Sequence, residues 1–349
     1  MFANGVSIRD GIERLVHDGD ASKAFAFLQG VQMESGNLTS DLDDAAALAR
    51  NATYTIVALG ERTYAEDGGN KDLMPLPSGF TDYVQALAAT GTKIILVLTQ
   101  GRPRLLGNLT ALASAILYAG LPCELGGQAI ANVLFGLVNP SGKLPLTYPK
   151  TDTFDNLATP YYKRNGTHCL ATGALCPAEF EFGAGLSYTT FQYSNAALSN
   201  SSMTYKQGEN HTLVVSVVVT NTGKVAGQET ILLFVMPPPR ANAESKLLKK
   251  FTKVWLSPGE AKTATFGVAP DDWGYYSNEI GQGLAKSAPT GTYVWFFQGS
   301  GDKLSFEWTM PGTSAVLPRS ESSKAQSDGN AVVLSVVAVV AVAWIHVWC

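Results

Sequence analysis

Helix-like and strand-like segments alternate over the first part of the chain. Short β-branched or apolar runs at residues 54–59 and 93–99 predict two buried strands. The spacing of apolar positions predicts helices over residues 41–50, 80–89, 111–118 and 128–135. Strands separated by helices indicate an α/β sandwich domain with a mainly parallel sheet, covered by helices on its faces.

A different pattern begins near residue 192. Residues 211–220 alternate in polarity and are rich in valine, and a turn follows at Asn221-Thr222-Gly223. Further short strands are predicted at residues 229–235, 251–256, 261–268 and 291–298, with glycine and proline turns between them. This second part is therefore predicted to be an all-β sandwich.

The last residues form a third, purely apolar segment. Residues 331–349 carry no formal charge, and as a helix they are just long enough to cross a bilayer. A polar, serine-rich stretch precedes them, which is also the pattern of a lipid-anchor signal. We expect a C-terminal hydrophobic helix that is either a transmembrane segment or an anchor signal; a buried core helix is the alternative.

Composition and charge narrow the class of protein. Apolar residues make up 46% of the chain and charged residues 15%, which is typical of a globular protein. The net charge is −4 and there is no long basic run, so nucleic acid is not an expected partner. The four histidines lack the spacing of metal ligands, and no cofactor is expected.

Sequons and cysteines point to the secretory pathway. Asn-X-Ser/Thr sequons mark possible N-glycosylation at Asn37, Asn51, Asn108, Asn165, Asn200 and Asn210. Cys169 and Cys176 flank a glycine-containing loop, which suits a local disulfide. Because the first residues contain no apolar run of signal-peptide length, we interpret the chain as a fragment of a longer secreted precursor, membrane-anchored at the cell surface or in the secretory pathway.

The candidate chemistry lies in an acidic loop. Residues 60–69 directly follow the predicted strand 54–59 and contain Glu61 and Glu66. Ligand contacts in open α/β sheets lie at the carboxyl ends of strands, where this loop is expected. On the residues alone, the expected state of both carboxylates is that of solvated loop groups, as for most surface carboxylates.

Several motifs in a fixed order carry a resemblance to a known family. Glu124 to Gly136 and then Asn139-Pro140-Ser141-Gly142-Lys143 resemble the signature of the α/β sandwich domain of family 3 glycoside hydrolases. The segment from Phe182 to Thr189 resembles the motif that ends that domain. Asn221 to Lys224 and Pro258-Gly259-Glu260 resemble the fibronectin type III-like domain that commonly follows. Within the signature, Gly126 and Gly127 are predicted to allow a sharp turn, and Cys123 stands where the family pattern has glycine.

The resemblance covers residues 1–312 and sets the expected domains. An α/β domain is expected over residues 1–165 and an immunoglobulin/fibronectin type III-like domain over residues 195–312. Linkers are expected at residues 166–194 and 313–330, before the apolar segment 331–349.

The resemblance also implies a chemistry and its site residues. Family members of this type hydrolyse β-linked glucosides or xylosides with retention, using two carboxyl groups about 5 Å apart. It implies that the acid/base is a Glu of the acidic loop, with Glu66 preferred and Glu61 the alternative. It places the nucleophile on a preceding barrel domain, whose motif has no counterpart in this sequence, so hydrolysis by this chain alone is not expected. The competing reading is a non-catalytic, membrane-anchored carbohydrate-binding or structural remnant.

Overall fold

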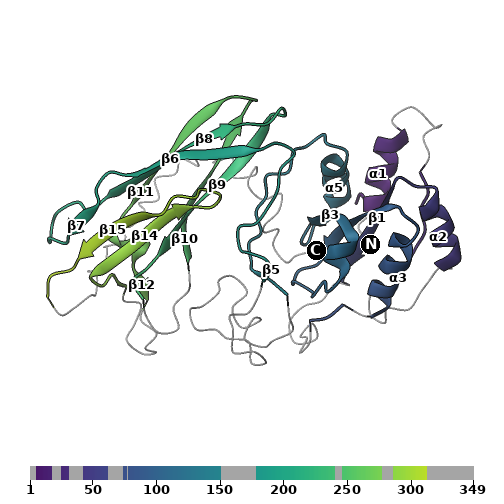
Figure 1. Cartoon of the computed structure of the whole chain (residues 1–349), viewed down its shortest axis with the longest axis horizontal. Helices are drawn as coiled ribbons and strands as arrows, with labels where there is room; N and C mark the ends of the chain where they lie inside the picture. The colour runs from purple at the N-terminus through teal and green to yellow at the C-terminus, as the bar shows by residue number, and fades with distance from the viewer. Residues whose placement is uncertain are drawn as a thin grey trace, which may run out of the picture.

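The computed structural model describes residues 5–17, 25–30, 42–61, 74–76, 78–150, 178–239, 246–276 and 286–312. These residues form an α/β part and a β-sandwich that lie beside each other (Figure 1). The C-terminal segment 331–349, Cys169, Cys176 and Glu66 all lie outside the described residues.

The α/β part is built on a parallel sheet of β1 (Tyr54–Gly60), β2 (Lys93–Thr99) and β3 (Ala113–Tyr118), in the order β1-β2-β3. Helices α2 (Leu42–Arg50) and α3 (Ser78–Ala88) pack on one face of this sheet. Their apolar side chains share one core with alternate residues of β1 and β2, including Leu59, Leu96 and Leu98. The predicted mainly parallel sheet is confirmed.

The predicted helix over residues 111–118 is wrong. A single turn, α4 (Leu109–Leu112), leads directly into strand β3, which pairs with β2. The alanine-rich sequence of residues 111–118 favours a helix locally. The unpaired edge of β2 supplies ladder partners for the backbone, and this tertiary pairing overrides the local preference.

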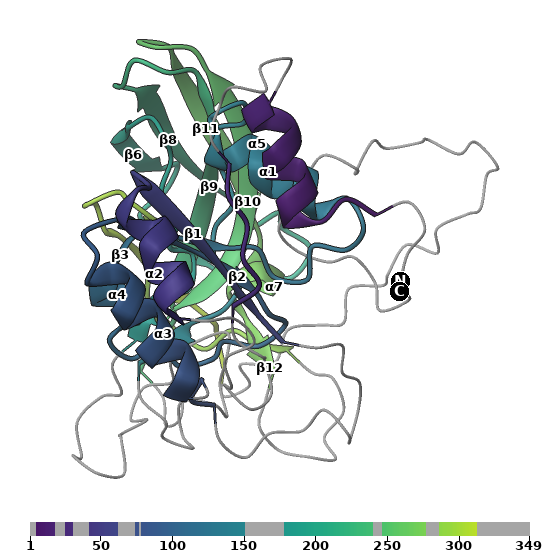
Figure 2. The same cartoon turned by 90° about the vertical axis from the view of Figure 1, so that its right-hand side faces the viewer.

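Two helices pack so closely that their backbones touch. Helix α1 (Ile8–His17) lies beside α5 (Gly126–Leu134) in both Figure 1 and Figure 2. A Cβ added at Gly127 would lie 2.2 Å from the carbonyl oxygen of Ser7, and one at Gly11 would lie 2.4 Å from the carbonyl oxygen of Gly127. Neither Gly126 nor Gly127 has positive φ. The expected turn is therefore the wrong reason for this glycine pair, because close helix contact requires Gly127 instead.

The segment before the sandwich pairs with the α/β part. Strand β4 (Tyr148–Pro149) pairs with β5 (Ala178–Phe180), which lies in the range predicted as a linker. Asn139 of the signature accepts hydrogen bonds from the Ser187 hydroxyl at 2.7 Å and the Tyr188 backbone N–H at 2.8 Å. Residues 178–188 are thus attached to the α/β part along much of their length.

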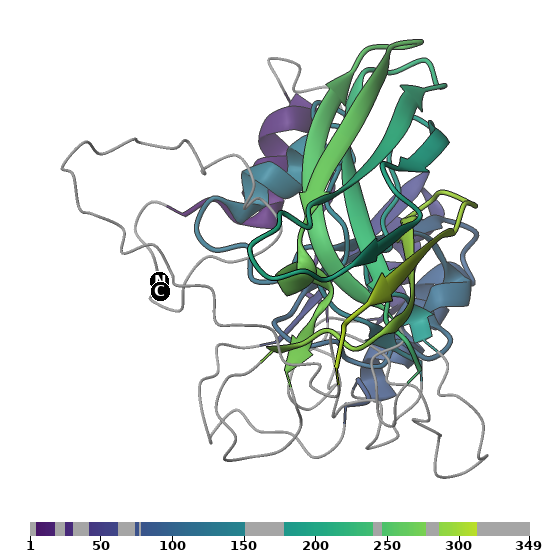
Figure 3. The same cartoon turned by 90° about the vertical axis from the view of Figure 1, so that its left-hand side faces the viewer.

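The second part is a sandwich of two sheets (Figure 3). The first sheet has the order β10-β9-β14-β15-β7 and the second the order β11-β8-β6. The strands are β6 (Phe191–Leu198), β7 (Ser202–Thr204), β8 (Leu213–Asn221), β9 (Gly227–Met236), β10 (Leu247–Leu256), β11 (Ala261–Val268), β14 (Gly291–Phe297) and β15 (Leu304–Thr309). A short helix, α7 (Pro270–Trp273), and the pair β12 (Tyr275–Tyr276) and β13 (Lys286–Ser287) complete it. The all-β prediction is confirmed, although β6, β7 and β15 were not anticipated.

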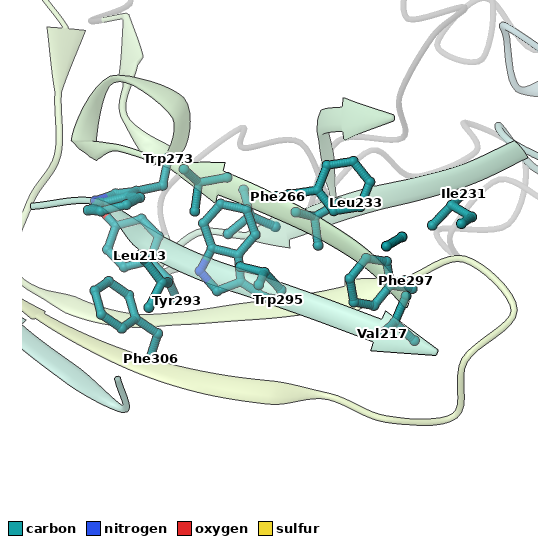
Figure 4. Close-up of a cluster of buried hydrophobic side chains, with 14 of the residues drawn as sticks. Leu213, Val217, Ile231, Leu233, Phe266, Trp273, Tyr293, Trp295, Phe297 and Phe306 are labelled. Atoms are coloured by element: carbon teal, nitrogen blue, oxygen red, sulfur yellow. The ribbon is translucent and has the colours of Figure 1, made fainter. Parts of the chain in front are cut away.

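Aromatic side chains fill the space between the two sheets (Figure 4). Trp273 is fully buried and makes edge contacts with Trp295, Phe306 and Trp308, at centroid distances of 5.3–6.2 Å. Valines at alternate positions of β8 and aliphatic residues of β9 close the core around them. Large aromatic side chains dominate the energetics of such a core, so Trp273 and its neighbours contribute strongly to the stability of the sandwich.

A buried polar network joins the two parts. Lys143 of the signature lies 3.3 Å from the carboxylate of Glu229 on β9, and the Tyr193 hydroxyl donates to the same carboxylate at 2.8 Å. Lys253 donates to the Ser141 hydroxyl at 2.8 Å, and burial lowers the pKa of its ammonium group. Burial, followed by the Glu229 charge, raises the pKa of Tyr193 far above its ordinary value. Residues 139–143 of the signature thus contribute contacts between the two parts.

The predictions on membrane and secretion remain predictions. In the described ranges, no helix has both the length and the apolar character to span a bilayer. Of the six sequon asparagines, Asn51, Asn108, Asn200 and Asn210 are described, and all four are exposed. Exposure is a requirement for glycosylation, so these four positions are compatible with it.

Candidate functional site

The site is built at the carboxyl edge of the parallel sheet. Strands β1 and β2 stay paired to their last residues, and the Glu61 backbone N–H donates to the Thr99 carbonyl oxygen at 3.2 Å. A Cβ added at Gly60 would lie 2.1 Å from the Thr99 hydroxyl oxygen. The close approach of the two strands therefore requires glycine here, and it fixes Glu61 at the sheet edge.

Glu61 is held by two arginines that follow β2. The Arg102 Nε donates to Glu61 Oε2 at 3.2 Å, and Arg104 Nη1 donates to Glu61 Oε1 at 3.1 Å. The side chains of Glu61 and Arg104 are only 14% and 10% exposed. Because both carboxylate oxygens accept charge-assisted hydrogen bonds in a largely buried place, this is a well-ordered ionic cluster.

Arg104 also contacts the segment after the acidic loop. Its Nη2 donates to the Pro75 carbonyl oxygen. The Leu105 backbone N–H donates to the Met74 carbonyl oxygen at 3.0 Å, and Pro75 forms an isolated parallel bridge with Leu105. Residues on both sides of the range 62–73 are thus attached to one short segment, residues 102–105.

Tyr148 holds the segment of residues 100–104 in place through its hydroxyl group. Its buried hydroxyl accepts a hydrogen bond from Gln100 Nε2 at 2.7 Å and donates one to the Arg104 carbonyl oxygen at 2.6 Å. Tyr118 and Phe180 contact its ring edge-to-face. Burial raises the pKa of the Tyr148 hydroxyl far above its ordinary value, so it stays protonated and keeps donating.

The structure describes one of the two predicted acid/base candidates. Glu61 lies in the ionic cluster, where both of its oxygens are engaged by guanidinium groups. Both oxygens therefore anchor the segment of residues 102–105 to the end of strand β1. Glu66 falls outside the described residues, so its assignment stays a prediction.

Four residues of the site were not predicted from the sequence: Gln100, Arg102, Arg104 and Tyr148. The first three belong to the run Gln100-Gly101-Arg102-Pro103-Arg104, which directly follows the strongest strand signal of the chain. Two arginines at a strand end, close to an acidic loop after the neighbouring parallel strand, are the signal that could have revealed the ion pairs. Tyr148 gave no such signal, because its role depends on contacts distant in sequence.

Comparison with protein families gives two matches. Residues 2–188 match the Glycosyl hydrolase family 3 C-terminal domain, and residues 229–299 match the Fibronectin type III-like domain. The first match includes the whole site. It also includes residues 178–188, whose strand β5 pairs with β4.

Curated proteins show similarity over most of the chain. A lysosomal beta glucosidase of Dictyostelium discoideum is 34% identical over 76% of this chain, and a beta-xylosidase of Formosa agariphila is 33% identical over 83%. The chain spans only 32% and 39% of the lengths of these two relatives.

Solved structures show the same arrangement. A β-glucosidase from Erythrobacter marinus superposes with a TM-score of 0.70 at 28% identity, over 88% of this chain and 43% of that chain. A β-glucosidase from Listeria innocua has a TM-score of 0.71 at 24% identity, which supports the shared fold.

Proposed function

Because this chain belongs to glycoside hydrolase family 3, we propose that it supplies the acid/base half of a retaining active site for β-linked glucosides or xylosides. The relatives that suggest these substrates are a beta glucosidase and a beta-xylosidase. The other half, the nucleophile, belongs in this proposal to a barrel domain outside these 349 residues.

The state of Glu61 is the observation that carries the assignment within the acidic loop. Its two oxygens bind Arg102 and Arg104, and we therefore assign the acid/base role to Glu66, the other glutamate of the loop. The ionic cluster holds Glu61 at the start of the acidic loop, and its Arg104 contacts the Pro75 carbonyl oxygen beyond the end of the loop. A catalytic group on such a loop depends on a rigid support of this kind.

The proposed mechanism uses two proton transfers. Glu66, in its protonated form, gives its proton to the departing glycosidic oxygen while the barrel carboxylate bonds to the anomeric carbon. The resulting carboxylate of Glu66 then removes a proton from water, whose oxygen displaces the enzyme carboxylate from the sugar. The sugar leaves with its anomeric configuration retained, and Glu66 is protonated again.

Two exposed leucines lie in the segment after strand β3, and they suggest where the proposed barrel domain docks. Leu121 and Leu125 follow strand β3 and are 58% and 64% exposed. They sit in the segment that leaves the carboxyl end of the sheet, as the acidic loop does. Exposed apolar side chains grouped at one edge mark interaction surfaces, so we propose that the barrel covers this edge.

The test joins this chain to the barrel of a relative. The upstream part of the Dictyostelium enzyme, fused before residue 5, should give hydrolysis of an aryl β-glucoside, whereas the 349 residues alone should give none. Glu66→Gln in the fusion should lower kcat/KM by roughly 10²–10⁴-fold, because the general acid/base is lost. Azide should partly restore turnover by attacking the glycosyl-enzyme directly.

Two neighbouring carboxylates serve as controls. Glu61→Gln should give a smaller loss that azide does not rescue, since Glu61 anchors the loop. Asp67→Asn changes a carboxylate adjacent to Glu66 and should leave the azide response unchanged. Azide rescue of Glu61→Gln and not of Glu66→Gln would move the acid/base role to Glu61; an unaffected rate in both would refute the loop as the acid/base loop.

A further inference from the structure

We infer that Arg104 is a positioning residue. Its forked guanidinium joins Glu61 and Pro75, which lie on either side of residues 62–73, the segment that carries Glu66 and is called the Glu66 loop below, and so fixes where this loop begins and ends. The structural part of this inference stands by itself. Its catalytic part rests on the proposed function, because the loop carries Glu66.

The two terminal nitrogens of the Arg104 guanidinium bind residues on opposite sides of the loop. Nη1 donates to Glu61, the residue directly before the loop, at 3.1 Å. Nη2 donates to the carbonyl oxygen of Pro75, which lies just after the loop. The backbone bond from Leu105 to Met74 runs beside this contact. One side chain therefore holds two chain segments that the loop separates in sequence.

Arg104 can do this because its own place is fixed. Its side chain is 10% exposed, and its carbonyl oxygen accepts the hydrogen bond from the buried Tyr148 hydroxyl. Arg102 binds the second oxygen of Glu61 and prevents that carboxylate from rotating away. Bringing the ends of a loop together costs conformational entropy, and fixed end contacts of this kind offset it.

The position of the loop matters for catalysis because the loop carries the proposed proton donor, Glu66. A proton donor must lie within hydrogen-bond distance of the leaving oxygen, and a misplacement of about 1 Å can cost about 10²-fold in rate. Loosening the ends of the loop should therefore weaken proton donation specifically. It should matter little for a substrate whose leaving group departs without protonation.

Arginine is required for this role, not merely a positive charge. The planar guanidinium offers two nitrogens in a fixed fork, whereas the lysine ammonium is a compact point charge on a flexible stem. Lysine at position 104 could reach Glu61 or Pro75, but it could not hold both in the same arrangement. Arg104→Lys thus separates the geometric role from a purely electrostatic one.

The first experiment uses the 349-residue chain and needs no activity. Trypsin cleaves after Arg62 and Lys71, and a glutamate-specific protease cleaves after Glu66, all within the loop. Arg104→Lys should speed cleavage at these bonds roughly tenfold or more, the factor expected when charge-assisted hydrogen bonds are lost. Mass spectrometry of the fragments identifies the bonds, and denaturant unfolding of the same samples measures global stability.

The control for this experiment is Arg50→Lys, the same substitution at an exposed position at the end of α2. It should leave loop cleavage unchanged. Equal loop cleavage in wild type and Arg104→Lys would overturn the inference. So would faster cleavage that the loss of global stability accounts for completely.

The second experiment uses the barrel fusion and a series of leaving groups. Arg104→Lys should lower kcat/KM for phenyl β-glucoside about tenfold or more, while the value for 2,4-dinitrophenyl β-glucoside should change little. A parallel loss for both substrates would show a general structural defect and overturn the positioning role. If loop cleavage rises in the chain but the wild-type fusion is inactive, the proposed function fails while the structural part of the inference holds.

Discussion

At the scale of single residues, backbone conformation explains one departure from the family pattern. Cys123, which stands where glycine was expected, has a φ of 51°. This left-handed conformation costs a residue with a Cβ about 1–2 kcal/mol, whereas glycine adopts it freely. The cysteine therefore carries a strain that the family's glycine would avoid.

Substitutions at position 123 should reveal that strain. Cys123→Gly should unfold with a free energy about 0.5–1 kcal/mol higher than Cys123→Ala, because only alanine keeps the strained Cβ, and glycine's greater unfolded-state entropy offsets part of the gain. Urea denaturation of the two variants measures the difference. Gly120→Ala is the matched control: φ there is 63° and the nearest atom to an added Cβ lies at 4.0 Å, so it should cost a similar amount. Equal stability of the two Cys123 variants would contradict the strain.

At the scale of elements, the periodicity of apolar residues predicted the strands whose formation depends on local sequence. The strands over 93–99 and 261–268 have the bounds that the sequence pattern gave, because a continuous apolar run and a clean alternation mark them. Strand β3 was predicted as a helix, since its alanine-rich sequence carries no trace of its pairing with β2. In the site, the sequence pattern placed Glu61 at the end of its strand, but its two arginine partners were not predicted, because they follow a different strand.

The contact between α1 and α5 gives a sharp prediction for one glycine. Gly127→Ala would place a Cβ 2.2 Å from the Ser7 carbonyl oxygen and 2.3 Å from that of Val6, and backbone atoms cannot move aside as side chains do. We expect a loss of about 3 kcal/mol in unfolding free energy, measured by urea denaturation. Gly267→Ala, where the nearest atom lies 3.5 Å away, should cost much less. Similar losses for both would argue against a backbone contact between the helices.

At the scale of the whole molecule, the buried network around Glu229 couples the two domains. Lys143 comes from the α/β domain, whereas Tyr193 and Glu229 come from the sandwich, and the carboxylate is 7% exposed. Removing one partner leaves a buried charge without compensation, and this is far more costly than losing a surface pair. The network should therefore make the two domains unfold together.

Glu229→Gln tests this coupling. We expect a loss of about 3–5 kcal/mol in unfolding free energy and a split of one calorimetric transition into two, because Lys143 loses its counter-charge. Glu260→Gln removes an exposed ion pair with Lys262, and it should lower the unfolding free energy much less than Glu229→Gln does. A single transition with an unchanged midpoint in Glu229→Gln would show that other contacts hold the domains together.

The pairing of α1 with α5 also sets an order of events during synthesis. Helix α1 is made before the rest of the α/β domain. Gly127 and the Glu124 carbonyl, which accepts from the Val6 N–H at 2.7 Å, are made only after all three strands of the sheet. Until then α1 lacks its contacts with α5, and contacts so distant in sequence form slowly. The nascent α/β domain therefore waits with its first helix undocked, exposed to chaperones and proteases, until translation has passed α5.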